Sequence, residues 1–198
     1  MSWVGHDHGG SCPQEQADEM ANAQEVFAAL LEEATLDLLD GYGISPTLSG
    51  HENSESLEIE RSSLVSIIGF SGQAMRGSVC LKVPTQVALD THPQKDPVPT
   101  SSELHDWAGE LCNQLVGRAK NRLLRFGQTV GMGTPVVASS ETGLSLVSAH
   151  TTRAAVFVCG EATCTVSCDV RTDGDLDLVE LPPEEGEEPG LEGECFMF

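Results

Sequence analysis

The chain has 198 residues, of which 39% are hydrophobic, and this suffices for one compact domain with segments outside its core. Its 10 basic and 31 acidic side chains give a formal net charge of −21, which argues against binding to nucleic acid or to anionic membranes, because both need clustered Lys and Arg. No apolar run is long enough to span a bilayer. Without a secretory signal, the seven cysteines are expected to be reduced and the protein to be cytoplasmic.

The two ends differ in composition from the middle of the chain. Residues 1–18 show no apolar periodicity and are predicted to form a flexible acidic arm. The His-Asp-His run at residues 6–8 could contact a metal, but a solvated tail is favoured because a metal site needs further ligands held in place. Residues 173–198 are rich in acids and prolines and are predicted to be a disordered tail. The expected folded domain is therefore residues 19–172.

The first half of this domain is predicted to contain one helix and one hairpin. Apolar residues recur at helical spacing over residues 19–40, and Gly41 is expected to end the helix. Loop-like sequence follows to about residue 56. Residues 63–71 and 76–84 are then predicted to be strands of a hairpin, because they are short, apolar and separated by turn residues.

The second half begins with a short helix and a linker. Residues 84–89 are predicted to open a short helix, and the Pro-rich residues 93–99 a linker. A second long helix is predicted from a capping box at Thr100 and Glu103 to about Phe126.

Further strands are predicted after this helix. One begins near Pro135, and others cover residues 143–149, 153–159 and 162–170, the last two forming a hairpin. Cys159, Cys164 and Cys168 lie in this apolar sequence and are expected to be buried strand residues. The order of elements resembles an old duplication, and it predicts an α+β fold in which two long helices pack on an antiparallel sheet.

The second long helix carries an unusual polar strip. On a helical wheel, Asp106, Glu110, Asn113, Gly117 and Lys120 fall within an arc of about 80°. The opposite side is an apolar stripe of Leu104, Trp107, Ala108, Leu111, Leu115 and Ala119.

Such a strip can be an ordinary solvated helix face, but two of its residues do not suit that role. Asn113 is a poor helix former, and Gly117 costs about 1 kcal/mol relative to Ala while leaving a bare patch for another surface. The sequence has no Ser-His-Asp set, phosphate-binding loop or HExxH motif. Any chemistry would therefore have to be completed by groups that a partner supplies.

The strip, with the later Pro135, is similar to the signature of the CheC/CheX phosphatases of bacterial chemotaxis. The segment ELHDWAGELCNQLVGRAKNRLL resembles their active-site helix, and SLVSIIGFSGQAMRGSVCLKVP and RAAVFVCGEATCTVSCDVR resemble their two hairpins. Because Asp106-x-x-x-Glu110-x-x-Asn113 occurs once, the chain looks more like CheX than like CheC. The resemblance covers about residues 20–172 and implies a CheC-like fold with two pseudo-repeated halves.

The resemblance implies that the chain hydrolyses the aspartyl phosphate of a CheY-like response regulator. The partner would supply Mg²⁺ and a Lys, so this chain would need no metal or cofactor of its own. Asn113 would orient the attacking water, and Glu110 would contact the partner's Lys. Asp106, Gly117, Lys120 and Pro135 would support the site. Members that resemble CheX are typically homodimers, which implies a homodimer here.

Two non-catalytic alternatives, and more distantly a metal-binding role, remain open from the sequence. The flagellar switch proteins share this fold and bind regulators without hydrolysis, but they lack the Glu and Asn pair that Glu110 and Asn113 form here. The chain could also be a purely structural dimerisation module whose sheets join at their edges. Substitutions on the helix face would then have no effect on a phosphorylated regulator.

Overall fold

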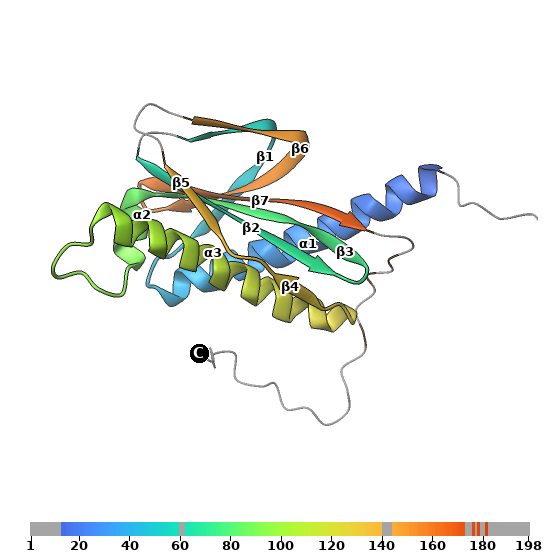
Figure 1. Ribbon diagram of the computed structural model, residues 1–198, viewed down its shortest axis with the longest axis horizontal. Coiled ribbons are helices and arrows are strands. Elements are labelled where there is room, and N and C mark those ends of the chain that lie inside the picture. The colour runs from blue at the N-terminus through green and yellow to red at the C-terminus, as the bar shows by residue number, and fades with distance from the viewer. Residues whose placement is uncertain are drawn as a thin grey trace, which may run out of the picture.

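The computed structural model shows which segments form regular structure (Figure 1). It describes residues 13–59, 62–139 and 144–172, with Leu176, Leu178 and Leu181. The helices are α1 (Pro13–Gly41), α2 (Thr85–Thr91) and α3 (Ser101–Leu123), with a 3-10 turn η1 (Leu124–Phe126). The strands are β1 (Thr47–Ile59), β2 (Ser63–Gly72), β3 (Met75–Pro84), β4 (Val130–Met132), β5 (Val136–Ser139), β6 (Leu144–Cys159) and β7 (Ala162–Thr172).

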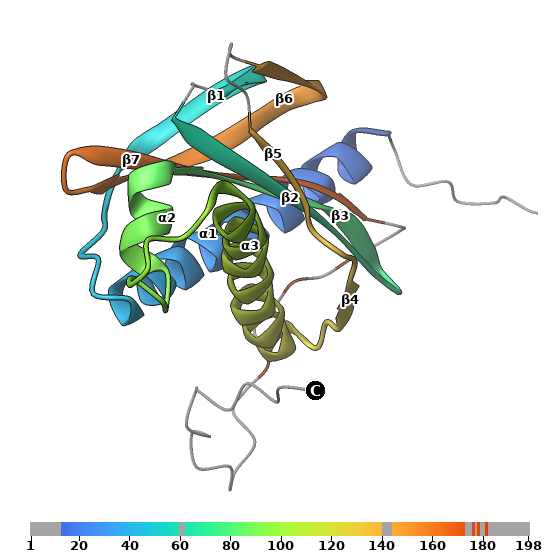
Figure 2. The same cartoon turned by 60° about the vertical axis from the view of Figure 1, so that its left-hand side comes forward.

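The described strands form one antiparallel sheet of seven strands, and α1 and α3 cover one of its faces. Its order is β1-β6-β7-β3-β2-β4, and β5 also pairs with β2. The two predicted hairpins, β2–β3 and β6–β7, meet where β3 pairs with β7. Helix α1 packs on β7, α3 packs on β2, and the helices pack against each other (Figures 1 and 2). This confirms the predicted α+β fold.

The core lies between these two helices and the sheet. Each helix buries most of its described apolar stripe, as the helical spacing predicts, and Trp107 of α3 is partly buried. The rings of Phe27 on α1 and Phe70 on β2 lie 4.8 Å apart. Cys159, Cys164 and Cys168 are buried, which confirms their expected role as strand residues. The largest fully buried side chains are Phe27, Phe157, Leu31, Leu38, Ile68, Met75, Leu111, Leu115 and Leu123.

Helix α3 begins and ends where the sequence predicts. The Glu103 backbone N–H donates to Thr100 Oγ1 over 3.4 Å, and the Thr100 backbone N–H donates to Glu103 Oε2 over 2.7 Å. This capping box satisfies two amides that the helix leaves unpaired, and the bond from the Thr100 backbone lowers the pKa of Glu103. After η1, Gly127 adopts φ 66°, which glycine tolerates without a steric penalty. The capping box thus fixes where α3 begins.

The expected loop to residue 56 is wrong, because residues 47–59 form strand β1. This strand pairs with β6 at the edge of the sheet. An edge strand needs backbone pairing on one side only, so a polar sequence such as HENSES can form it. The short strand β4 was also not predicted.

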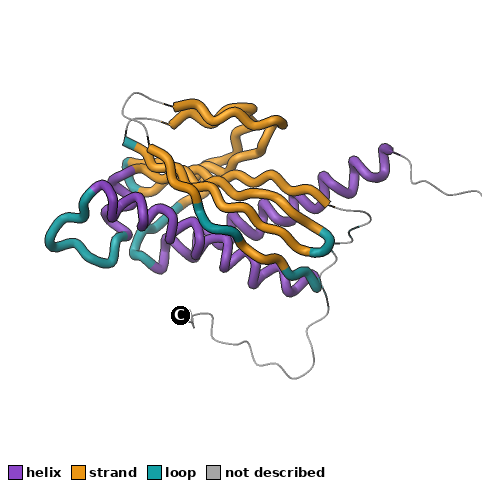
Figure 3. Tube along the Cα trace, in the orientation of Figure 1, coloured by secondary structure: helices purple, strands orange, loops and turns teal. Residues whose placement is uncertain are grey.

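The two strands predicted at residues 143–149 and 153–159 are one continuous strand, β6 (Figure 3). Its register against β1 shifts between Ser54, which pairs with Thr152, and Ser56, which pairs with Val147. The residues between the two predicted strands therefore lie at an irregularity inside β6. Such bulges add residues to one strand without ending it.

The expected segment boundaries at residues 18 and 172 differ from the described structure. Helix α1 already begins at Pro13, and proline suits the first position of a helix, where no amide is needed. After β7, Leu176 and Leu178 are buried, and the Leu181 N–H donates to the Arg125 carbonyl over 2.7 Å. Apolar spacing within the acidic sequence allows these leucines to reach the core. Residues 1–12, with the His-Asp-His run, lie outside the described residues.

Candidate functional site

Helix α3 presents the predicted polar strip on its outer side. Asp106 is exposed, and Glu110, Asn113, Gly117 and Lys120 are partly exposed. The residues that face the sheet are buried, namely Leu104, Ala108, Leu111, Cys112, Leu115, Val116, Ala119 and Leu123. Because both sets come from the same helical period, burial of the apolar stripe orients the strip outward.

Glu110 accepts two side-chain hydrogen bonds on this strip. Gln114 Nε2 donates to Glu110 Oε1 over 2.9 Å, and Asn113 Nδ2 lies 3.5 Å from Glu110 Oε2, at the limit of a hydrogen bond. Residues three and four positions apart lie side by side on a helix, so both contacts follow from sequence spacing. The structure therefore brings Glu110 and Asn113 together, as predicted.

Two further residues join this cluster that the sequence interpretation did not single out. Gln114 follows Asn113 directly and could have been found from its spacing of four from Glu110. Tyr42 follows the end of α1, and its hydroxyl donates to Gln114 Oε1 over 2.9 Å. No local signal relates Tyr42 to Gln114, because 72 positions separate them.

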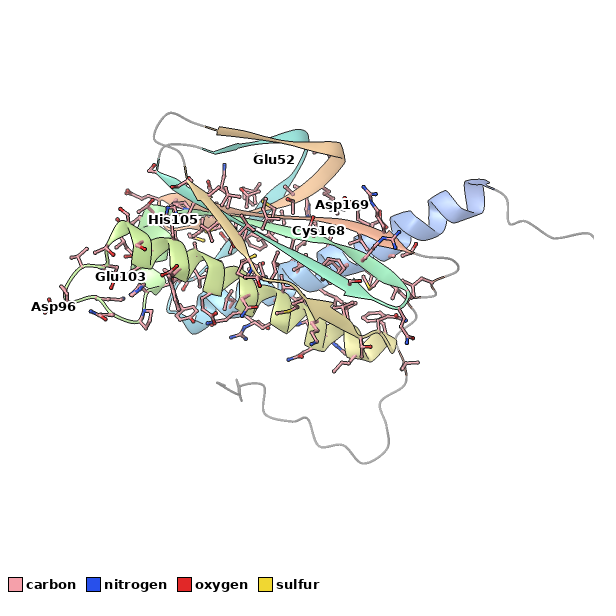
Figure 4. The ribbon with its side chains drawn as sticks, in the orientation of Figure 1. Glu52, Asp96, Glu103, His105, Cys168 and Asp169 are labelled. Atoms are coloured by element: carbon pink, nitrogen blue, oxygen red, sulfur yellow. The ribbon has the colours of Figure 1, made fainter. Side chains whose placement is uncertain are left out.

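Pro135 lies beside the site on the segment that enters β5. A Cβ built on Gly109, the neighbour of Glu110, would lie 3.5 Å from Pro135 Cγ and 3.3 Å from Val137 Cγ2. Further toward the beginning of α3, His105 Nε2 and Ser139 Oγ lie 2.8 Å apart (His105 is labelled in Figure 4). Pro135 therefore lies close to α3 at Gly109. Asp106 and Lys120 lie on the strip, but within the described residues neither bonds to the cluster around Glu110.

Gly117 and Gly109 allow a paired test of how α3 uses its two glycines. A Cβ on Gly117 would meet no atom within 4 Å, whereas one on Gly109 would press on Val137. We expect Gly117→Ala to raise the free energy of unfolding by about 1 kcal/mol, the helix preference of alanine over glycine. Gly109→Ala should gain less or lose stability. Urea unfolding of both variants measures this difference, and equal shifts would contradict the packing described here.

Cys112 lies next to Asn113 in the sequence but points into the core. Its Sγ lies 3.7 Å from the Ser66 carbonyl oxygen, and burial raises the pKa of its thiol to about 11. The thiol is therefore protonated near neutral pH, and a protonated thiol is a poor nucleophile. The polar groups at the exposed surface here are a carboxylate and carboxamides, which can orient reactants through hydrogen bonds.

Part of the chain that contains the strip matches a known protein family. Residues 64–159 match the family model described as "Chemotaxis phosphatase CheX", and this range includes Glu110, Asn113 and Pro135. No curated protein sequence matches the chain. None of the described helices combines the length and apolar character that crossing a membrane requires.

Solved structures show which known proteins share this fold. A chemotaxis protein CheX from Desulfovibrio desulfuricans superposes with a TM-score of 0.64 at 20% identity, over 73% of this chain and 99% of that one. CheX from Vibrio vulnificus gives 0.63 at 21% identity, over 73% and 99%. A CheC-like superfamily protein from Shewanella sp. PV-4 gives 0.63 at 20% identity, over 73% and 97%.

The antiparallel sheet with α1 and α3 on one face has the CheC-like fold. The family match begins at the second residue of β2 and extends through the end of β6, and so includes the helix that carries the strip. Residues 64–159 thus match the CheX family, and the domain around them has the fold of CheX and CheC-like proteins.

Proposed function

We propose that the chain hydrolyses the aspartyl phosphate of a phosphorylated CheY-like response regulator. The observation that carries this proposal is the pairing of Glu110 and Asn113 on the outward face of α3, within the region that matches a chemotaxis phosphatase family. The strip carries no Ser, Thr, Cys or His side chain. The partner's acyl phosphate would therefore be attacked by water, which this chain orients.

The hydrogen bonding of Asn113 supports a role in orienting that water. A carboxylate only accepts hydrogen bonds, so the group of Asn113 that faces Glu110 Oε2 must be its NH₂. The Oδ1 atom is then available to accept a hydrogen bond from a water molecule. An amide is too weak a base to deprotonate water, so Asn113 would contribute by placing the water in line with the phosphorus.

Glu110 is arranged to contact the partner. Each of its oxygens accepts one bond within the chain, which leaves lone pairs for the ammonium group of the partner's active-site Lys. The Mg²⁺ of the partner would neutralise charge on the phosphoryl oxygens. Asp106 would extend the contact at one end of the strip, and the bare patch at Gly117 would allow the partner to approach closely.

We expect Glu110→Ala to weaken both binding and phosphate release, each by about tenfold, because a charge-assisted contact is lost. The measurement is phosphate release from a purified phosphorylated receiver domain, with complex formation titrated in parallel. Glu161→Ala, at an exposed turn position, is the matched control. Unchanged affinity would remove the docking role, and a wild-type chain that leaves the receiver's own rate unaltered would refute the proposed function.

A homodimeric state and a cytoplasmic location stay predictions. The edge strand β1 offers unpaired backbone groups on one side, which is the kind of edge that a second copy can extend. Light scattering of the purified chain would measure its mass.

A further inference from the structure

We propose that Gln114 and Tyr42 are positioning residues that hold the Glu110 carboxylate in one orientation through a chain of hydrogen bonds. The inference rests on the proposed function and assigns roles to two residues outside the Glu-x-x-Asn pattern. Tyr42 Oη donates to Gln114 Oε1, Gln114 Nε2 donates to Glu110 Oε1, and both bonds are 2.9 Å long. These two hydrogen bonds thus connect the residue after α1 to the outward face of α3.

The chemistry of these groups allows only one donor-to-acceptor order for the two hydrogen bonds. The Glu110 carboxylate only accepts, so the amide group of Gln114 that faces it must be NH₂. The other end of the same amide is then a carbonyl oxygen, which can only accept from the Tyr42 hydroxyl. The orientation of one amide is therefore set from both ends. Since all three groups are partly buried, water competes less for these bonds than it would on an open surface.

Tyr42 is itself fixed by packing against residues that contact the protein interior. Its ring packs edge-on against Trp107, with the centroids 5.5 Å apart. The Trp107 indole N–H donates to Thr91 Oγ1 over 2.9 Å, and Thr91 is buried at the end of α2. His92 packs against the same indole at 5.5 Å. Tyr42 is therefore a fixed point to which Gln114 can tie Glu110.

The proposed reaction requires that the Glu110 side chain keeps one orientation. A glutamate on a helix surface samples several rotamers, and each must be lost when it contacts a partner's ammonium group. A displacement of about 1 Å in a reacting constellation can cost about a hundredfold in rate. The Gln114 bond restrains one carboxylate oxygen before the partner arrives, and the contact with Asn113 passes that restraint to the residue proposed to orient the water.

The experiment compares Gln114→Met and Tyr42→Phe in the wild-type chain and in a Glu110→Ala background. Phosphate release from a phosphorylated receiver domain is measured with this protein in excess, so that slow rates remain measurable. We expect Gln114→Met to lose about tenfold and Tyr42→Phe about threefold in the wild-type chain. In the Glu110→Ala background neither substitution should lower the rate of phosphate release further, because both act through the Glu110 carboxylate.

A matched control exists on α2, where Gln86 Nε2 donates to the Asp90 carboxylate over 2.9 Å at the same spacing of four residues. Gln86→Met should keep the wild-type rate. If Gln114→Met lowers the rate of phosphate release by the same factor in the wild-type and Glu110→Ala chains, the role of Gln114 is merely structural and the inference is overturned. If Asn113→Ala removes activity but Gln114→Met keeps it, the inference alone fails. If the wild-type chain does not accelerate phosphate release, the proposed function fails with it.

Discussion

Replacing Asn113 by alanine should reduce the acceleration of phosphate release by at least about a hundredfold, equivalent to about 2.7 kcal/mol of transition-state stabilisation. The alanine keeps the helix but removes the carbonyl oxygen that would orient the water. Asn113 is only partly buried, and its one side-chain hydrogen bond in the described structure is the weak one to Glu110. The melting temperature and the affinity for the receiver should therefore change little.

Two further variants sharpen this test. Asn121→Ala changes the same residue type on an exposed part of the same helix and should leave the rate unaltered. Asn113→Asp keeps the size of the side chain but places a second negative charge beside Glu110, and repulsion of the phosphoryl oxygens should also abolish activity. An Asn113→Ala chain that dephosphorylates the receiver as fast as wild type would show that another group orients the water.

Gly77→Ala should be the most damaging single methyl addition among the described strands. A Cβ at Gly77 on β3 would lie 1.9 Å from the Asp169 carbonyl oxygen on β7 and 2.9 Å from Phe70 Cζ. The carbonyl belongs to the backbone of a paired strand, so relief requires separation of β3 from β7, where the two hairpins join. We expect a loss of about 3 kcal/mol or more in the free energy of unfolding.

Gly69 provides the control for this prediction. It lies within β2, opposite Ser78, and a Cβ there would meet only the Gly77 carbonyl oxygen at an ordinary 3.8 Å. Gly69→Ala should therefore be neutral or slightly stabilising, because glycine loses more backbone freedom than alanine on folding. Urea unfolding measures both variants. Equal midpoints for Gly77→Ala and Gly69→Ala would contradict the close approach of β3 and β7.

The sequence alone predicted α3, the two hairpins and the polar strip, because each depends on interactions between near neighbours. The capping box joins residues three apart, and the strip and the apolar stripe both follow from 3.6 residues per turn. Glu110 and Asn113 could be placed on one face for the same reason. The family resemblance then added chemistry that spacing alone did not contain.

The tertiary structure decided what depends on pairing between distant segments. Strand β1 is polar and was predicted as loop, and only its pairing with β6 makes it a strand. The bond from Tyr42 to Gln114 likewise exists only because α1 and α3 pack side by side on the sheet. Periodicity reports which face of an element is apolar, but the partner of that face is set by the whole chain. The link from Glu110 through Gln114 to Tyr42 could therefore be known only from the folded structure.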